Sequence, residues 1–105
     1  GNVARDLGQL EEARDAYRES LEIRRRLKAL TGESPQSLRD LSVSLDKVGN
    51  VARDLGQLEE ARDAYREALE LVRPLCEVLS GDRELAPFEA SLASRLEQLD
   101  KAVRD

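Results

Sequence analysis

The chain has no histidine, methionine or tryptophan, and its aromatic residues are two tyrosines and one phenylalanine in 105 residues. With no histidine and a single cysteine, Cys76, the usual zinc and haem ligand sets cannot be assembled and no internal disulfide can form. We therefore expect neither a metal nor a cofactor. A core so poor in aromatics must consist of Leu, Val and Ala, which is typical of closely packed helices rather than of a sheet sandwich.

Long apolar runs and positive net charge are also missing. No apolar stretch approaches the roughly 20 residues that a membrane span needs, and the amino terminus has no signal-peptide pattern. The chain carries 17 Lys and Arg against 22 Asp and Glu, a net charge of -5, so its field opposes nucleic acid and anionic membrane surfaces. We expect a cytoplasmic protein with no nucleic-acid partner and no membrane partner.

The residue patterns of catalytic sites are missing too. The sequence has no histidine, no catalytic serine motif and no glycine-rich phosphate loop. Its many carboxylates lie on expected solvated helix faces, where they keep ordinary acidity. The sequence therefore predicts a chain that is not an enzyme.

What the sequence does contain is an internal repeat. Residues 1–19, GNVARDLGQLEEARDAYRE, recur without change as residues 49–67, which gives a period of 48 residues. A unit of roughly 20 to 50 residues usually cannot bury its apolar face alone and stacks on its neighbour, which produces an elongated solenoid with a groove. Such arrays bind partners.

Apolar spacing divides the repeat into two helices. The first is expected over about residues 35–55, with Ser34 as N-cap, Pro35 at its first position and Gly56 in the turn that ends it. The second is expected to start near Leu58 and to lie antiparallel to the first. The expected buried side chains are Leu38, Leu41, Leu45, Val48, Ala52 and Leu55 in the first helix, and Ala61, Ala64, Tyr65, Ala68, Val72, Cys76 and Leu79 in the second.

The other two copies are incomplete, so we predict a single all-α domain of five helices. Its parts are a partial repeat (1–34), a full repeat (35–82) and the first helix of a third repeat (83–105). In the partial repeat, a stub of the first helix should precede a second helix over about residues 10–30. The expected buried side chains are Ala13, Ala16, Tyr17, Ser20, Ile23, Leu27 and Leu30 in that helix, and Phe88, Leu92, Leu96, Leu99 and Val103 in the last one.

Residues 45–68, which read L-x-x-V-G-N-x-A-x-x-x-G-x-L-x-x-A-x-x-x-Y-x-x-A, resemble a tetratricopeptide repeat. The first copy matches the pattern through Tyr17, whereas the third has Asp100 in the place of a signature glycine. The resemblance implies antiparallel helix hairpins stacked as a right-handed α-solenoid. Small residues such as Gly49 let the two helices approach, and Tyr65 fills the space between them. The unit exceeds the family's usual length of about 34 residues, and in this it is similar to the repeats of kinesin light chains.

The resemblance also implies a binding groove, because in tetratricopeptide folds the side of the first helix that faces away from the core stripe lines the concave surface. Amide and guanidinium groups there could hold an extended backbone or a carboxylate. A carboxylate would be repelled by Asp46 and Glu97, which replace the lysines of relatives that bind acidic termini. Alternatively, this mixed-charge face is only solvated and paired with itself. The candidate groove residues are Asn2, Arg5, Val43, Asp46, Asn50, Arg53, Lys101 and Arg104.

The leading functional hypothesis is therefore a scaffold that binds a peptide or protein partner, as a segment of a longer repeat array. A rival hypothesis is a structural repeat whose open ends associate, forming a homodimer or a larger assembly through the terminal helices. The basic cluster at residues 24–28 is interpreted as a solvated outer face with partners about one turn earlier in its own helix.

Overall fold

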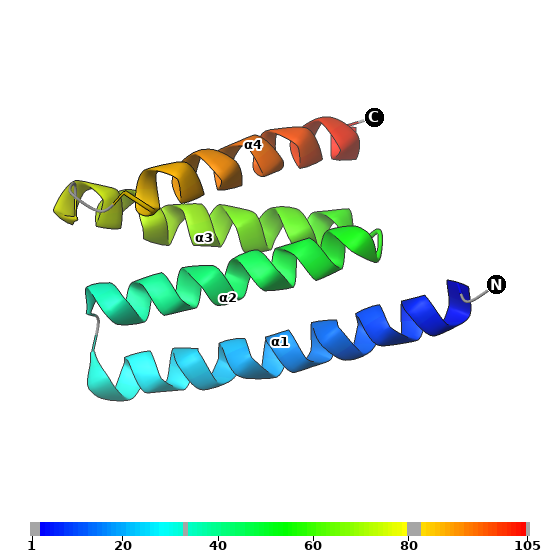
Figure 1. Ribbon diagram of the computed structural model, residues 1–105, viewed down its shortest axis with the longest axis horizontal. Helices are drawn as coiled ribbons and strands as arrows, with labels where there is room; N and C mark the ends of the chain where they lie inside the picture. Colours follow the sequence, from blue (N-terminus) through cyan, green and yellow to red (C-terminus); the bar gives the residue numbers. More distant parts are fainter. Residues whose placement is uncertain (1–2, 33, 80–82, 105) are drawn as a thin grey trace.

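The computed structural model describes residues 3–32, 34–79 and 83–104. Consecutive helices pack side by side in chain order, so that α2 lies between α1 and α3, and α4 lies on α3 (Figure 1). The described residues contain no strand, and the predicted all-α helical-repeat class is confirmed. The helices are α1 (Val3–Thr31), α2 (Pro35–Asp54), α3 (Leu58–Val78) and α4 (Leu85–Arg104).

Both ends of α2 have the predicted caps. The Ser34 hydroxyl accepts a hydrogen bond from the backbone N–H of Ser37 at 3.1 Å, and the Ser37 hydroxyl accepts one from the Ser34 N–H at 2.9 Å. Pro35 follows at the first helical position, where its missing N–H costs nothing. At the other end Gly56 has a φ of 79°, a conformation that glycine adopts without strain.

The core is centred on the pair α2 and α3. The predicted positions Leu41, Leu45, Val48 and Ala52 of α2 are all buried. The predicted positions of α3 from Ala61 to Val72 are buried as well, and Cys76 packs partly buried against the same core. The structure adds four buried leucines that the predicted stripes omitted, Leu21, Leu69, Leu75 and Leu85.

Tyr65 is fully buried against Gly49. A Cβ added at Gly49 would lie 2.7 Å from Cε1 of Tyr65, so only a residue without a side chain fits there. The predicted close approach of the two helices at this glycine is confirmed.

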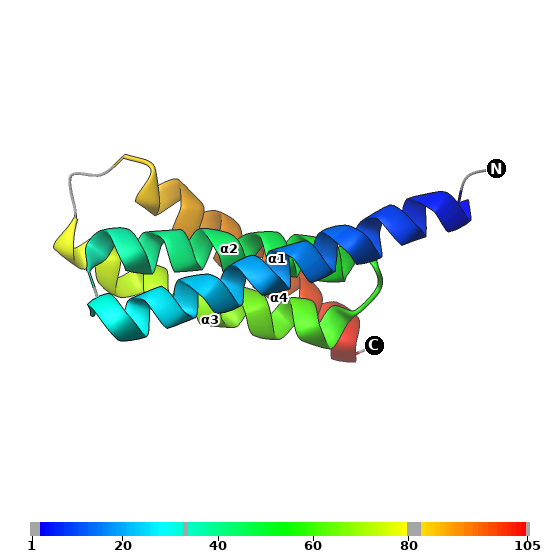
Figure 2. The ribbon, with the colours of Figure 1, turned by 90° about the horizontal axis from the view of Figure 1, so that it is seen from below.

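The amino-terminal helix corrects the prediction of five helices. Residues 3–31 form one continuous helix through Gly8, whereas the identical sequence in the second copy contains the end of α2, a turn at Gly56 and the start of α3. The expected separate stub is wrong. In the second copy the turn at Gly56 allows α3 to pack on α2, whereas the helix of the first copy continues through Gly8. The amino end of α1 extends beyond the neighbouring helices (Figure 2).

The face of α1 that packs on the molecule is also different from the predicted one. Ala16, Ile23, Leu27 and Leu30, which were expected to be buried, are exposed. Leu21 is buried instead, and Tyr17 packs beside it against the core. The predicted face assumed a first helix on its other side, but among the described residues α1 packs mainly on α2, so it buries the narrower strip that faces α2.

Ion pairs connect α1 to the next two helices. Arg18 pairs with Glu60 of α3, Arg25 with Glu67 of α3 at 2.7 Å, and Arg24 with Asp40 of α2 at 3.5 Å. Two members of the basic cluster thus find partners on other helices rather than one turn earlier in their own. All these side chains are partly exposed, so each pair contributes about 0.2 to 1 kcal/mol.

Candidate protein-binding surface

The candidate groove residues of α2 lie on the side of the helix that faces α4. Val43, Asp46, Asn50 and Arg53 follow at spacings of three and four residues, which places them along one side of a helix. Val43 and Arg53 are exposed, whereas Asp46 and Asn50 are half-buried.

Arg95 of α4 brings two of these residues together. Its guanidinium Nη1 donates to Oδ1 of Asp46 and lies 3.4 Å from Oδ1 of Asn50. The Tyr65 hydroxyl of α3 donates to the same Asn50 oxygen. The Arg95 guanidinium carbon also lies 5.8 Å from the centre of the Tyr65 ring, which adds a cation–π contact. This Arg95 network links α2, α3 and α4.

Burial sets the acidity of the network. Desolvation raises the pKa of the Asp46 carboxyl above its ordinary value of 3.8, although the cations around it, Arg95 first, act in the opposite direction. Burial also raises the pKa of the Tyr65 hydroxyl, so this group stays protonated and remains a donor.

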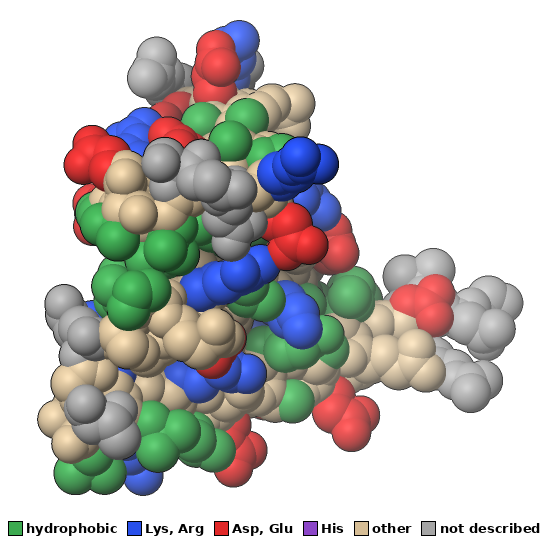
Figure 3. Space-filling view, turned by 60° about the vertical axis from the view of Figure 1, so that its left-hand side comes forward, with side chains coloured by type: hydrophobic (Ala, Val, Ile, Leu, Met, Phe, Trp, Pro, Cys, Tyr) green, Lys and Arg blue, Asp and Glu red, His purple; other side chains and the backbone are tan. Residues whose placement is uncertain are grey.

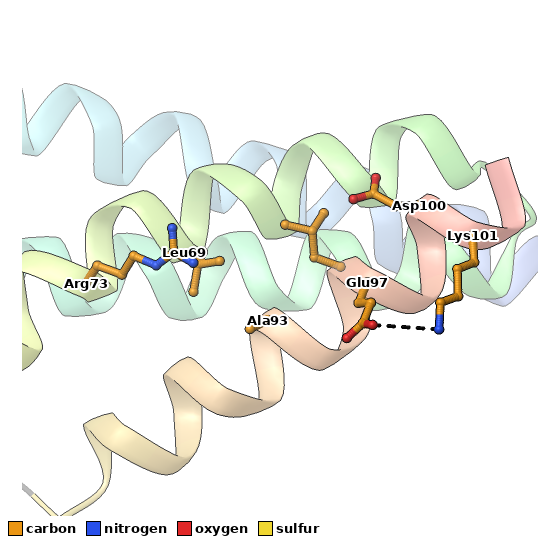
Figure 4. A pocket seen from close by; sticks show the side chains of 7 residues that line it. Leu69, Arg73, Ala93, Glu97, Asp100 and Lys101 are labelled. Atoms are coloured by element: carbon orange, nitrogen blue, oxygen red, sulfur yellow. Dashed lines mark ion pairs between the residues drawn. The ribbon is translucent and has the colours of Figure 1, made fainter. Parts of the chain in front are cut away.

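Lys101 lies on another part of α4, away from these contacts. It pairs with Glu97 at 3.7 Å, and both side chains are largely exposed. They border an open hollow of about 320 Å³ between α4 and α3, whose α3 wall includes Leu69 and Arg73 (Figure 4). Lys101 is therefore not joined to Asp46 and Asn50 by any contact of the described residues.

Three candidate residues cannot be placed as side chains. Asn2 lies outside the described residues. Arg5 lies in α1 and Arg104 in α4, but the structure describes only their backbone and not their side chains. Their assignment to the groove stays a prediction.

Arg95 is not among the residues predicted from the sequence, although its spacing carried a signal. Arg95 follows Leu92 by three residues and precedes Leu99 by four, so it lies at the edge of the predicted apolar stripe, next to these two leucines. A charged residue at such a position needs an acidic partner on a neighbouring helix. Asp46, on the polar side of α2, is that partner.

The model of the family described as tetratricopeptide repeat matches residues 1–73, more than half of the chain. The chain belongs to the tetratricopeptide-repeat family. Tetratricopeptide repeats are non-catalytic scaffolds that generally mediate protein–protein interactions. Among curated proteins and among solved structures, none matches this tetratricopeptide-repeat chain.

The described residues contain neither a cluster suited to a metal ion nor a helix suited to cross a membrane. No group of three or more His, Cys, Asp and Glu side chains there could hold a metal ion. None of the described helices combines the length and the apolar character that crossing a membrane requires.

Proposed function

We propose that this tetratricopeptide-repeat chain binds an extended peptide segment of a protein partner along the side of α2 that carries Val43, Asn50 and Arg53. The observation that carries the proposal is the orientation of the Asn50 amide. Both hydrogen bonds of this side chain use its Oδ1, as acceptor from Tyr65 and Arg95. No hydrogen bond of the described residues uses the Nδ2 group, which can therefore donate to a peptide carbonyl.

The surroundings of Asn50 support a peptide rather than a free carboxylate. Asp46 and Arg95 pair with each other and leave little net charge. Val43, 38% exposed, offers an apolar contact one helical turn before Asp46. The exposed Arg53 adds a donor for backbone carbonyls beyond Asn50.

The test removes the amide donor of residue 50 and keeps its acceptor oxygen. Asn50→Asp keeps an oxygen for Tyr65 and Arg95 but removes the Nδ2 donor. Peptides selected from a random display library on the wild-type chain should lose about tenfold in affinity for Asn50→Asp, as expected for one lost hydrogen bond in a desolvated site. Gln9→Glu makes the same chemical change on the exposed amino end of α1 and should leave binding unchanged.

Circular dichroism of both variants should match the wild type, because the structural bonds of Asn50 are retained. Equal affinity of the selected peptides for the wild type and Asn50→Asp would refute the proposed surface.

A further inference from the structure

One side of α1 carries a row of mostly apolar residues, which we call the α1 stripe: the exposed Ala16, Ile23, Leu27 and Leu30 and the half-buried Ser20. At about 100° per residue these positions fall on one side of the helix. Ile23, Leu27 and Leu30 are 51%, 53% and 83% exposed. Figure 3, in which α1 runs along the bottom, shows hydrophobic side chains at the surface there.

The second copy of the repeat shows how the corresponding face of α3 is packed. Ala64, Ala68 and Leu75 of α3 stand 48 residues after Ala16, Ser20 and Leu27. These α3 residues are 7%, 0% and 2% exposed, and Ala64 and Ala68 belong to the core, whereas Val78, the counterpart of Leu30, is 71% exposed. From Ala16 to Leu27 the α1 stripe therefore corresponds to a helix-packing face, which in α1 is mostly exposed.

We propose that the α1 stripe is closed by a second copy of this chain, through an antiparallel, two-fold symmetric pair of α1 helices. The stripe fits itself in this orientation, because its small residues lie toward the amino end and its large ones toward the carboxyl end. With the two-fold axis beside Leu21 and Glu22, Ala16 of one copy faces Leu27 of the other. Ser20 likewise faces Ile23. Large side chains thus pack against small ones along the whole contact.

Charge favours the same orientation. Glu19 and Arg26 are both exposed and flank the α1 stripe on the same side, seven residues apart. In the antiparallel pair, Glu19 of each copy lies near Arg26 of the other, which gives two symmetric ion pairs. A parallel pair would place these flanks on opposite sides of the contact, so Glu19 and Arg26 of one copy would not meet those of the other.

The other open helix, α4, is a poorer place for α1 of a second copy. When the leucines of α4 are aligned with the apolar stripe of α2, Asp100 of α4 takes the position of Gly49 in α2. Any Cβ at Gly49 would meet the Tyr65 ring at 2.7 Å, so α4 cannot receive Tyr17 of a second copy as α2 receives Tyr65. This excludes a head-to-tail continuation of the stack with unchanged geometry.

The association should be reversible and weak, because one helix pair buries less than the roughly 1,600 Å² of a standard interface. We expect a dissociation constant in the micromolar range. Sedimentation equilibrium over a hundredfold concentration range should show a monomer–dimer equilibrium. Ile23→Glu should give a monomer throughout, with unchanged helix content because residue 23 is exposed. Val78→Glu, at an exposed apolar residue of α3, is the matched control and should dimerise like the wild type.

The orientation is tested by exchanging charges. Glu19→Arg and Arg26→Glu should each weaken the dimer several-fold, and the double variant should restore it. A monomeric wild type at all concentrations overturns the proposal. A dimer that persists in Ile23→Glu also overturns the proposal. So does a double variant that dimerises no more tightly than the single variants.

A further outcome identifies a different occupant. If the wild type stays monomeric but binds a synthetic peptide of residues 35–54, the stripe takes a helix of the α2 kind and the dimer is refuted. Asn50→Asp should leave dimerisation unchanged, so failure of the peptide-binding surface and failure of the α1 dimer are distinguishable.

Discussion

Gly49 of α2 packs directly against the ring of Tyr65 of α3, with room for no side chain at Gly49. The Tyr65 ring covers this glycine, and its hydroxyl reaches Asn50, the next residue of α2. The contact therefore couples the packing of the repeat to the orientation of the amide on the proposed binding surface.

Gly49→Val should lower the free energy of unfolding by about 1 to 3 kcal/mol or more, because the added atoms overlap a fully buried ring. Urea denaturation measures this loss. Gly49→Val combined with Tyr65→Leu should be less destabilising than the sum of the two single changes, since the smaller side chain relieves the overlap. If the changes in the free energy of unfolding were strictly additive, residues 49 and 65 would not be in steric contact.

Gly8→Ala and Gly56→Ala should change stability in opposite directions, although the two glycines share the same flanking sequence. Gly8 lies within α1 with nothing near its missing Cβ, so alanine should stabilise by about 0.5 to 1 kcal/mol. Gly56 has a φ of 79°, where alanine is strained, and should lose about 1 kcal/mol or more. Thermal unfolding of the two variants decides the matter. A loss of stability in Gly8→Ala would indicate a turn at Gly8.

Leu45→Ala should cost about 2 to 5 kcal/mol, because Leu45 is 2% exposed and its truncation leaves a cavity at the centre of the hairpin. Val78→Ala, at a residue that is 71% exposed, should stay within about 0.5 kcal/mol of the wild type. Chemical denaturation of both variants provides the comparison. A cost below about 1 kcal/mol for Leu45→Ala would show that this stripe is not the core.

Asp46 should make the free energy of unfolding fall as the pH rises through its raised pKa. The folded state keeps the Asp46 proton to a higher pH than the unfolded chain, which releases it near the ordinary value of 3.8. Between these two values the folded state binds more protons, so its stability decreases with increasing pH. The stability of the wild type relative to Asp46→Asn should therefore decrease as the pH is raised from about 3 to about 7. A difference that grows with pH would contradict the raised pKa.

Arg95→Met should destabilise the chain by about 1 to 3 kcal/mol at neutral pH, because it leaves the half-buried Asp46 carboxylate without its cation. The loss should be smaller in acid, where Asp46 is protonated, and the pKa of Asp46 followed by NMR should rise further. Arg66→Met removes a more exposed arginine with a 4.0 Å partner and serves as the control. An equal loss at both pH values would mean that Arg95 acts through packing alone.

Local sequence determined α2, α3 and the contact between them. The capping residues at Ser34 and Gly56 and the apolar spacing from Leu41 to Ala52 act within one helix or one turn, so they could be interpreted without knowing the neighbours. The packing of Gly49 against Tyr65 was predictable from the resemblance to the tetratricopeptide repeat, in which both residues occupy signature positions.

Tertiary structure alone decided the conformation of the first copy and the composition of the site. Residues 1–19 and 49–67 are identical, yet one segment lies in a single helix and the other forms a helix end, a turn and a helix start. The turn at Gly56 lets α3 pack along α2, whereas Gly8 lies inside α1. The partnership of Asp46, Asn50 and Arg95 likewise joins helices whose contact no local pattern specifies, since it depends on how α4 lies on α3.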